Sequence, residues 1–265
     1  MNANSKSPLI IGHRGAASVA PENTIAAFKR AMDDGADGIE FDVRLSRDAV
    51  PVVIHDATLK RTAALPNAVS SLTASELEKV DVGSWFNRRF PTRARNDYAK
   101  ERVPTLERTF AKVRDLRGPL YVELKSDGVA DAALVTAVTA LVTEFEFRDR
   151  VIVESFTLEN IQLVKRIDAR IKTVALFEPK RAPLSLVSGK RLIRRAIAVG
   201  ADELALHRSS VNQRLALLAK QAGLSVVVWT VDTPSWIARA GALGVNALIT
   251  NRPGELVRAR ASARD

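Results

Sequence analysis

The chain has 265 residues and no cysteine, which excludes disulfide bonds and thiolate metal sites. Its hydrophobic fraction of 46% is ordinary for a globular protein, and no apolar stretch is long enough to span a bilayer. The formal net charge of +10 favours anionic ligands. Aromatic residues make up only 5% of the chain, and no basic groove with interleaved aromatics stands out, so we expect no nucleic-acid partner and only a weak attraction to anionic surfaces.

Short runs of β-branched residues alternate along the chain with longer amphipathic segments. We predict strands at 9–12, 37–42, 120–124, 151–155, 172–177, 202–206, 225–230 and 246–249. Examples of the helices predicted between them are 24–33, 130–143, 158–167, 215–221 and 234–242. The alternation favours a parallel sheet covered by helices, and eight such strands fit a closed (β/α)₈ TIM barrel that spans 1–265 as a single domain.

The beginning of the chain contains the first candidate site residues. Residues 1–7 are polar and lack the apolar core of a signal peptide, so we expect a cytoplasmic protein. The first predicted strand leads into His13 and Arg14. Asn23 is a plausible N-cap of the following helix, which would leave Glu22 as a charge complement to the helix N-terminus.

The second predicted strand is followed by a short apolar run at 50–54, too soon for a crossover helix. A hairpin that turns around 47–49 is therefore expected. If its centre is near Asp48, positions 42 and 54 pair, as do positions 41 and 55. Glu40 and Asp42 project to one face of the strand because they are two residues apart, and the returning arm sets His55 beside them at the barrel rim.

Residues 58–103 are too many for an ordinary connection between two elements. Thr73 is a plausible N-cap within this segment, and Glu76 follows three residues later, as in a capping box. We interpret 58–103 as a small inserted subdomain over the catalytic face and not as an independent domain.

Later strand ends add further polar residues. Glu123 and Lys125 lie two apart at the end of the third predicted barrel strand, and Trp229 closes the penultimate apolar run. Glu154 and His207 also lie at strand ends, where a role near the metal or the substrate stays open. Active residues of such barrels gather at the carboxyl ends of the strands.

These residue types suit the cleavage of a phosphodiester. Three carboxylates, Glu40, Asp42 and Glu123, are typical ligands of Mg²⁺ or Ca²⁺. Arg14 and Lys125 have the charge to hold phosphate oxygens. Two imidazoles beside such an ion can exchange protons near neutral pH. Each residue also has a structural alternative: a hydrogen-bonded imidazole for the histidines, ion pairs for the charged residues and a core aromatic for Trp229.

An ordered set of short motifs resembles the signatures of the glycerophosphodiester phosphodiesterase family. Those motifs are His13-Arg14-Gly15, Pro21-Glu22-Asn23-Thr24, Glu40-x-Asp42, His55-Asp56, Pro104-Thr105-Leu106, Glu123-Leu124-Lys125, Ser155-Phe156, Trp229-Thr230-Val231 and Thr250-Asn251-Arg252-Pro253. Together they cover nearly the whole chain. The resemblance implies a barrel hydrolase that uses a divalent cation and releases glycerol 3-phosphate and an alcohol.

The resemblance also implies a role for each site residue. His13 and His55 match the acid and base, while Glu40, Asp42 and Glu123 match the metal ligands. Arg14 and Lys125 match phosphate contacts, Trp229 matches a residue at the glycerol end of the substrate, and 58–103 resembles the family's insertion. The assignment of acid and base between the two histidines stays open, as does the choice between water and the glycerol 2-hydroxyl as nucleophile.

Two departures from the family pattern stand out. The hairpin turn has Asp48-Ala49 where aspartate-glycine is common, so the turn is expected to differ. Asp232 follows Trp229-Thr230-Val231 where asparagine is frequent, and its charge is expected to weaken binding of an anionic substrate or to select a different alcohol.

Two alternative functions remain at this stage. The same machinery would serve a phospholipase D-like hydrolysis of lysophospholipids, which an apolar mouth formed by the insertion would favour. The other alternative is a non-catalytic basic binding protein that keeps the barrel. The sequence does not predict the oligomeric state.

Overall fold

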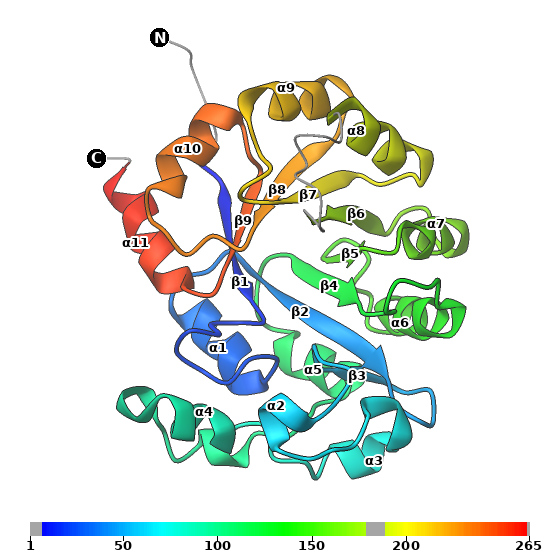
Figure 1. Cartoon of the computed structure of the whole chain (residues 1–265), viewed down its shortest axis with the longest axis vertical. Helices are drawn as coiled ribbons and strands as arrows, with labels where there is room; N and C mark the ends of the chain where they lie inside the picture. The colour runs from blue at the N-terminus through cyan, green and yellow to red at the C-terminus, as the bar shows by residue number, and fades with distance from the viewer. Residues whose placement is uncertain (1–6, 179–188, 264–265) are drawn as a thin grey trace.

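Eight parallel strands close into a barrel, and helices surround it (Figure 1). This computed structural model describes residues 7–178 and 189–263. The barrel strands are β1 (Leu9–His13), β2 (Gly38–Leu45), β4 (Leu120–Leu124), β5 (Val151–Ser155), β6 (Lys172–Phe177), β7 (Glu203–His207), β8 (Ser225–Trp229) and β9 (Ala247–Thr250). They follow one another around the barrel, and pairing of β1 with β2 closes it, so the predicted (β/α)₈ fold is confirmed.

The helices that cover the barrel alternate with its strands along the chain. They are α1 (Ile25–Asp33), α5 (Leu106–Val113), α6 (Ala132–Glu144), α7 (Leu158–Ile167), α8 (Gly189–Ala198), α9 (Gln213–Gln221), α10 (Trp236–Leu243) and α11 (Pro253–Ser262). Two large apolar clusters fill the layer between these helices and the strands. The five helices given as examples from the sequence are all present.

The N-cap predicted for α1 is wrong by one residue. Thr24 is the cap, with extended backbone and a side-chain oxygen that accepts a hydrogen bond from the amide of Ala27. Asn23 instead has a positive φ of 57°, and its side chain turns toward β2. Asparagine and threonine both suit an N-cap, and the tertiary contact of Asn23 decides between them.

Side-chain alternation along the strands separates the barrel core from the site. Ile11 and Tyr121 pack inside the barrel with apolar residues from β5 to β9. Two residues further along, the same strand faces carry His13 and Glu123. Side chains two residues apart in a strand point to the same face. The interior of the barrel therefore has an apolar layer and, next to it at the carboxyl end of the strands, a polar layer.

The predicted hairpin is confirmed. β3 (Pro51–Val53) pairs antiparallel with β2, with Val43 opposite Val53 and Leu45 opposite Pro51. The amide of Ile54 donates to the carbonyl of Asp42 at 3.0 Å, as the register centred on position 48 requires.

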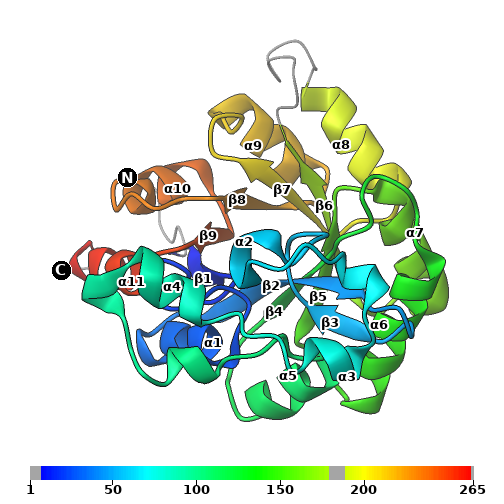
Figure 2. The ribbon, with the colours of Figure 1, turned by 60° about the horizontal axis from the view of Figure 1, so that its bottom comes forward.

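Residues 58–103 fold into short helical turns beside the hairpin. These are α2 (Lys60–Ala63), η1 (Val69–Ser71), α3 (Ala74–Leu77), α4 (Ser84–Arg89), η2 (Pro91–Arg93) and η3 (Tyr98–Lys100). Both views of the ribbon show α2, α3 and α4 next to β3, α1 and α5 (Figures 1 and 2). Thr73 and Glu76 form the predicted capping box at the start of α3. The segment shares an apolar cluster with the hairpin, while its status as a subdomain stays a prediction.

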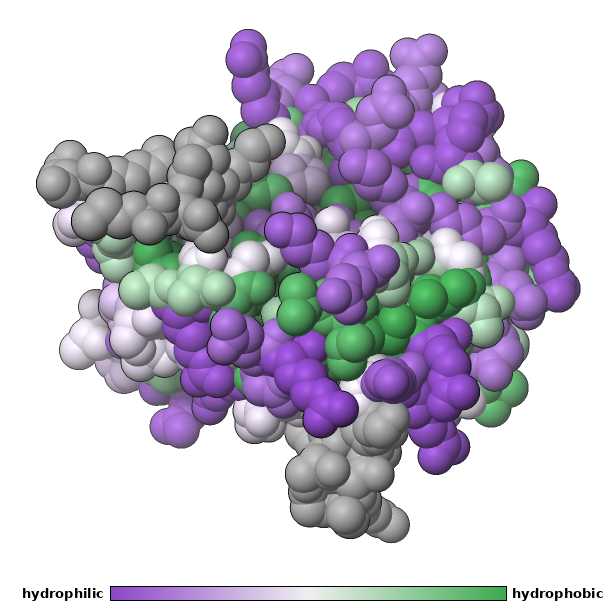
Figure 3. Space-filling model, turned by 90° about the horizontal axis from the view of Figure 1, so that it is seen from above, coloured by the Kyte–Doolittle hydropathy of each residue, from purple (hydrophilic) through white to green (hydrophobic). Residues whose placement is uncertain are grey.

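On the face seen in Figure 3, hydrophilic residues surround a band of apolar residues. Ile197 of α8 and Leu217 of α9 are 52% and 54% exposed, and scattered exposed residues of this kind are usual in folded proteins. Helices long and apolar enough to cross a bilayer are absent from residues 7–178 and 189–263. Residues 1–6, which belong to the polar N-terminal stretch, lie outside the described residues.

Candidate active site

Neighbouring strands bring the predicted acids and one histidine together. In the parallel register, His13 of β1 lies opposite Glu40 of β2, and Asp42 lies opposite Glu123 of β4. Each of Glu40, Asp42 and Glu123 offers one carboxylate oxygen within 4.8 Å of the others, and all three residues are buried. The sequence spacing and the barrel register therefore place the acids at one point, as predicted.

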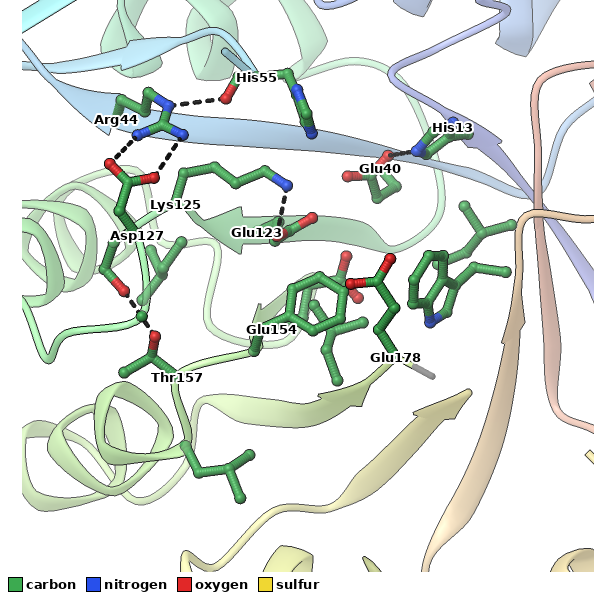
Figure 4. A pocket seen from close by; sticks show the side chains of 18 of the residues that line it. His13, Glu40, Arg44, His55, Glu123, Lys125, Asp127, Glu154, Thr157 and Glu178 are labelled. Atoms are coloured by element: carbon green, nitrogen blue, oxygen red, sulfur yellow. Dashed lines mark hydrogen bonds and ion pairs between the residues drawn. The ribbon is translucent and has the colours of Figure 1, made fainter. Parts of the chain in front are cut away.

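The hairpin supplies the second histidine. His55 directly follows the residue that pairs with Asp42, so the returning arm sets its imidazole on the same side of the cavity as His13 (Figure 4). Arg44 of β2 fixes this end of the arm, because its Nε donates to the His55 carbonyl at 2.7 Å and its other two nitrogens bind Asp127.

The acid cluster carries uneven charge. Burial and the neighbouring carboxylates raise the pKa of Glu40 well above its usual value, and burial is the main cause of the raised pKa of Glu123. Burial would also raise the pKa of Asp42, but the charges of Arg14 and Lys125 outweigh it and lower that pKa. Full ionisation of the three acids is therefore costly, and added positive charge at this point would relieve that cost.

Two cationic side chains lie directly against these acids. Lys125 Nζ is 2.7 Å from Glu123 Oε1 and 3.1 Å from Asp42 Oδ1. Arg14 Nε is 3.1 Å from Asp42 Oδ2, and the Arg14 amide donates to Glu40 Oε2 at 2.9 Å. Burial alone would lower the pKa of Lys125, but both acids outweigh it and raise that pKa. Both cations therefore stay charged at the edge of the acid cluster.

The two predicted histidines are neutral at neutral pH. Burial, together with the charge of Arg14, lowers the pKa of His13 to about 4. Burial likewise lowers the pKa of His55. His13 Nε2 lies 3.9 Å from Glu40 Oε2, and the His55 Nδ1 contacts Asp56 Oδ1 at 2.6 Å. A neutral imidazole keeps one unprotonated nitrogen, which is the form that accepts a proton.

Sequence reasoning missed several residues that hold the site. Asn23 donates to Asp42 Oδ2 at 2.8 Å and accepts a hydrogen bond from the Asp42 amide. Arg61 of the insertion binds Glu22 and Asp56, which in turn contact Arg14 and His55, respectively. The available signals were the adjacency of Asp56 to His55 and the place of Glu22 and Asn23 in a motif that resembles the family. Nothing in the local pattern around Arg61 or Asn23 indicates these partners.

The cavity above the acids has a volume of about 830 Å³. Its lining includes the two histidines, Arg14, Lys125 and Trp229. Trp229 is half-buried with its ring 5.4 Å from that of Phe156, and its buried Nε1 has no hydrogen-bond partner among the described residues. Glu154 also lines the cavity, and burial raises its pKa well above the usual value.

The residues present fit a divalent cation. Glu40, Asp42 and Glu123 provide three buried oxygens at one point, which is the donor set that Mg²⁺ and Ca²⁺ prefer. Asp42 Oδ1 is buried and receives no hydrogen bond of good geometry from the described residues, although Lys125 lies close to it. An unpartnered buried carboxylate oxygen is costly, and a cation at this point would remove the cost.

The fold and the site define a class of protein. Acids, imidazoles and cations meet at the carboxyl end of a parallel barrel, which is where barrel enzymes have their active sites. The cavity thus has the chemistry of a hydrolase that acts on an anionic substrate.

Comparison with known proteins identifies the family. The sequence profile of the Glycerophosphoryl diester phosphodiesterase family matches residues 13–255. A glycerophosphodiester phosphodiesterase of Caldanaerobacter subterraneus subsp. tengcongensis is 34% identical over 249 residues, which cover 94% of this chain and 96% of the relative. The chain therefore belongs to this family of phosphodiesterases, which confirms the resemblance and the expectation of an enzyme.

Solved structures agree with this membership. A phosphodiesterase of Oleispira antarctica, in complex with the product sn-glycerol-3-phosphate, aligns with a TM-score of 0.82 and 25% identity, over 96% of each chain. A glycerophosphodiester phosphodiesterase of Agrobacterium tumefaciens aligns with a TM-score of 0.76 and 28% identity, over 95% of this chain and 99% of the other.

Proposed function

We propose that this protein hydrolyses glycerophosphodiesters to glycerol 3-phosphate and an alcohol, with Mg²⁺ or Ca²⁺ as cofactor. The observation that carries the proposal is the meeting of three buried acids, two neutral histidines and two cations in one cavity. The product in the Oleispira antarctica structure supports glycerol 3-phosphate as a product here. We also propose a cytoplasmic location, which rests on the sequence alone.

The cationic residues bind the phosphate. Arg14 lines the cavity and keeps its positive charge beside the acids, so it attracts the phosphoryl oxygens. Lys125 contributes a point charge beside it. Glu40, Asp42 and Glu123 hold the cation, which when bound supplies Lewis-acid polarisation of a phosphoryl oxygen. Trp229 lines the glycerol end of the substrate.

The histidines move the protons. One neutral imidazole takes a proton from the nucleophile, which is water or the glycerol 2-hydroxyl, as the new bond to phosphorus forms. The bond from phosphorus to the alcohol oxygen breaks, and the second histidine gives a proton to that oxygen. The negative charge of the bound phosphodiester raises the pKa of this imidazole, so it takes up that proton from solvent when the substrate binds. His13 and His55 lie on the same side of the cavity with their partners already in place, which supports a shared acid–base role.

The lysophospholipid alternative lacks its expected support. An apolar mouth formed by the insertion would favour it, and Trp85, Phe86 and Phe90 are apolar residues of that segment. Phe86 is fully buried, however, and the other two pack against it. The cavity lining formed by the described residues does not include these three aromatics. A water-soluble glycerophosphodiester is therefore the substrate we propose.

The direct test is release of glycerol 3-phosphate from glycerophosphocholine by the purified protein, with Mg²⁺, Ca²⁺, Mn²⁺ or a chelator. We expect turnover that requires a divalent cation and is faster than with lysophosphatidylcholine. His13→Ala and His55→Ala should each lower kcat by about 10²- to 10⁴-fold without unfolding the protein. His207→Ala is the matched control. His207 is not among the described residues that line the cavity and only packs on the outer side of the site, with its ring 5.4 Å from that of Trp229, so its loss should lower kcat far less.

Two results would contradict the proposal. Near-normal rates in both the His13 and His55 variants would refute the acid–base assignment. Salt-sensitive binding of nucleic acid or anionic vesicles without any turnover would favour the basic binding protein instead.

A further inference from the structure

Asp232 binds the residue that holds His13. It lies between β8 and α10, and Asn251 directly follows β9. Asp232 Oδ1 accepts from the Asn251 amide at 2.8 Å and from Thr250 Oγ1 at 3.1 Å. Asp232 Oδ2 accepts from Asn251 Nδ2 at 2.9 Å, and Asn251 Oδ1 lies 2.7 Å from His13 Nδ1. The side chain of Asn251 therefore links the Asp232 carboxylate to the imidazole of His13.

The chemistry of these groups allows a single arrangement of hydrogens. An ionised carboxylate only accepts hydrogen bonds, so the Asn251 amide must turn its NH₂ toward Asp232. Its oxygen then faces His13 and can only accept. The hydrogen of the neutral imidazole must therefore sit on His13 Nδ1, which leaves Nε2 unprotonated.

The free Nε2 lies on the side of the acid cluster, 3.9 Å from Glu40 Oε2. That is the nitrogen able to exchange a proton with groups bound in the cavity. If the Asn251 amide were reversed, its NH₂ would face Nδ1, and the hydrogen of the imidazole would move to Nε2. His13 would then be unable to accept a proton there.

We propose that Asp232 is a positioning residue that sets the tautomer of His13 through the side chain of Asn251. The proposal rests on the acid–base role of His13 in the proposed function. The carboxylate is needed because it satisfies both Asn251 donors at once, whereas an asparagine at 232 has only one oxygen for them. This chain has aspartate at 232 where asparagine is frequent in the family it resembles.

The test reads the tautomer directly by ¹⁵N NMR of the full chain with Mg²⁺ present, at about pH 8, where an ordinary imidazole is neutral. The chain has three histidines, so His13→Gln assigns the signals of His13. The protonated and unprotonated ring nitrogens have well-separated ¹⁵N shifts. We expect a single Nδ1–H tautomer for His13 in the native protein and a shift toward the Nε2–H form in Asp232→Asn.

A matched variant separates this role from a loss of packing. Thr250→Val removes another hydrogen bond to the Asp232 carboxylate but leaves both Asn251 contacts, so the His13 tautomer should not change. Asn251→Ala should also abolish the tautomer preference, which keeps the test available if Asp232→Asn does not fold. In kinetics, Asp232→Asn should lower kcat by about 10- to 100-fold with little change in KM. It should have no further effect on kcat in the Asn251→Ala background.

The outcomes distinguish this inference from the proposed function. An unchanged His13 tautomer in both Asp232→Asn and Asn251→Ala overturns the inference, whatever the activity. A changed tautomer with unchanged kcat supports the positioning role and contradicts the acid–base role of His13.

Discussion

Replacing Arg61 by methionine removes the guanidinium group that joins the inserted segment to the active site. Arg61 Nη1 and Nη2 bind the two oxygens of Glu22 at 2.7 and 2.8 Å, and its Nε binds Asp56 Oδ2 at 2.7 Å. Glu22 also accepts from Arg14 Nη1, and Asp56 contacts His55 Nδ1. The change therefore loosens one phosphate-binding and one acid–base residue at the same time.

The expected loss of stability lies between that of a buried and an exposed ion pair. The Glu22 side chain is 12% exposed, but that of Arg61 is 43% exposed. Breaking a buried pair costs about 3–5 kcal/mol and an exposed pair contributes about 0.2–1 kcal/mol. With solvent screening of Arg61, we expect a fall of about 2 kcal/mol in the free energy of unfolding, or about 4–8 °C in Tm for a domain of this size.

The loss should also depend on pH through Glu22. Burial alone would raise the pKa of Glu22, but the hydrogen bonds from Arg61 and the charge of Arg14 outweigh it and the pKa is lowered. A lowered folded-state pKa gives stability that is present above the unfolded value of about 4.3 and is lost as the pH falls through the folded value. Without Arg61 the folded pKa of Glu22 rises toward the unfolded value, so Glu22 contributes less pH-dependent stability in the Arg61→Met variant. The difference in stability between the two proteins should therefore shrink from about pH 7 to about pH 4.

The assay is urea unfolding of both proteins at about pH 7 and at about pH 4, with kcat for glycerol 3-phosphate release measured in parallel. We expect kcat to fall by about 10-fold. Arg95→Met is the matched control. Arg61 lies over the ring of Trp85, and Arg95 likewise lies over an aromatic ring and binds a carboxylate through two nitrogens, but on the surface. It should change stability by less than about 0.5 kcal/mol. An Arg61→Met protein as stable and as active as the control would refute the reasoning.

Three further changes test other parts of the structure. Ala49 in the hairpin turn has a φ of 58°, which glycine adopts more easily than alanine, so Ala49→Gly should raise the free energy of unfolding by about 0.5–1 kcal/mol. Ala111→Gly within α5 is the control and should lower it by about 1 kcal/mol. Equal thermal shifts in the two variants would contradict this reasoning. Gly15→Ala should lower Tm, because Gly15 has a φ of 81° and an added Cβ would come 2.5 Å from the Ala27 carbonyl carbon; an unchanged melting curve would count against the tight turn after β1. Binding of Mg²⁺ should strengthen from about pH 5 to about pH 7 with release of protons, because the raised pKa of Glu123 makes the ion compete with a proton; calorimetry that finds pH-independent affinity would contradict the acid site.

The local pattern of the sequence determined the barrel and the centre of the site. The strand period of two places Glu40 and Asp42 on one face, and it places Glu123 above the apolar interior. The hairpin register followed from the short connection centred on Asp48, and this register set His55 beside the acids. These features depend on neighbouring residues and on the geometry of parallel strands, so the sequence contains enough information to predict them.

Only the tertiary structure decided which side chains support that centre. Asn23 looked like a helix cap, yet its side chain binds Asp42 of β2 because the loop after β1 folds back over the barrel end. Arg61 reaches Glu22 across 39 residues, and Asn251 reaches His13 across 238 residues. Such contacts arise when loops from distant strands close over the same barrel end, and no local period of the sequence encodes which polar groups then meet.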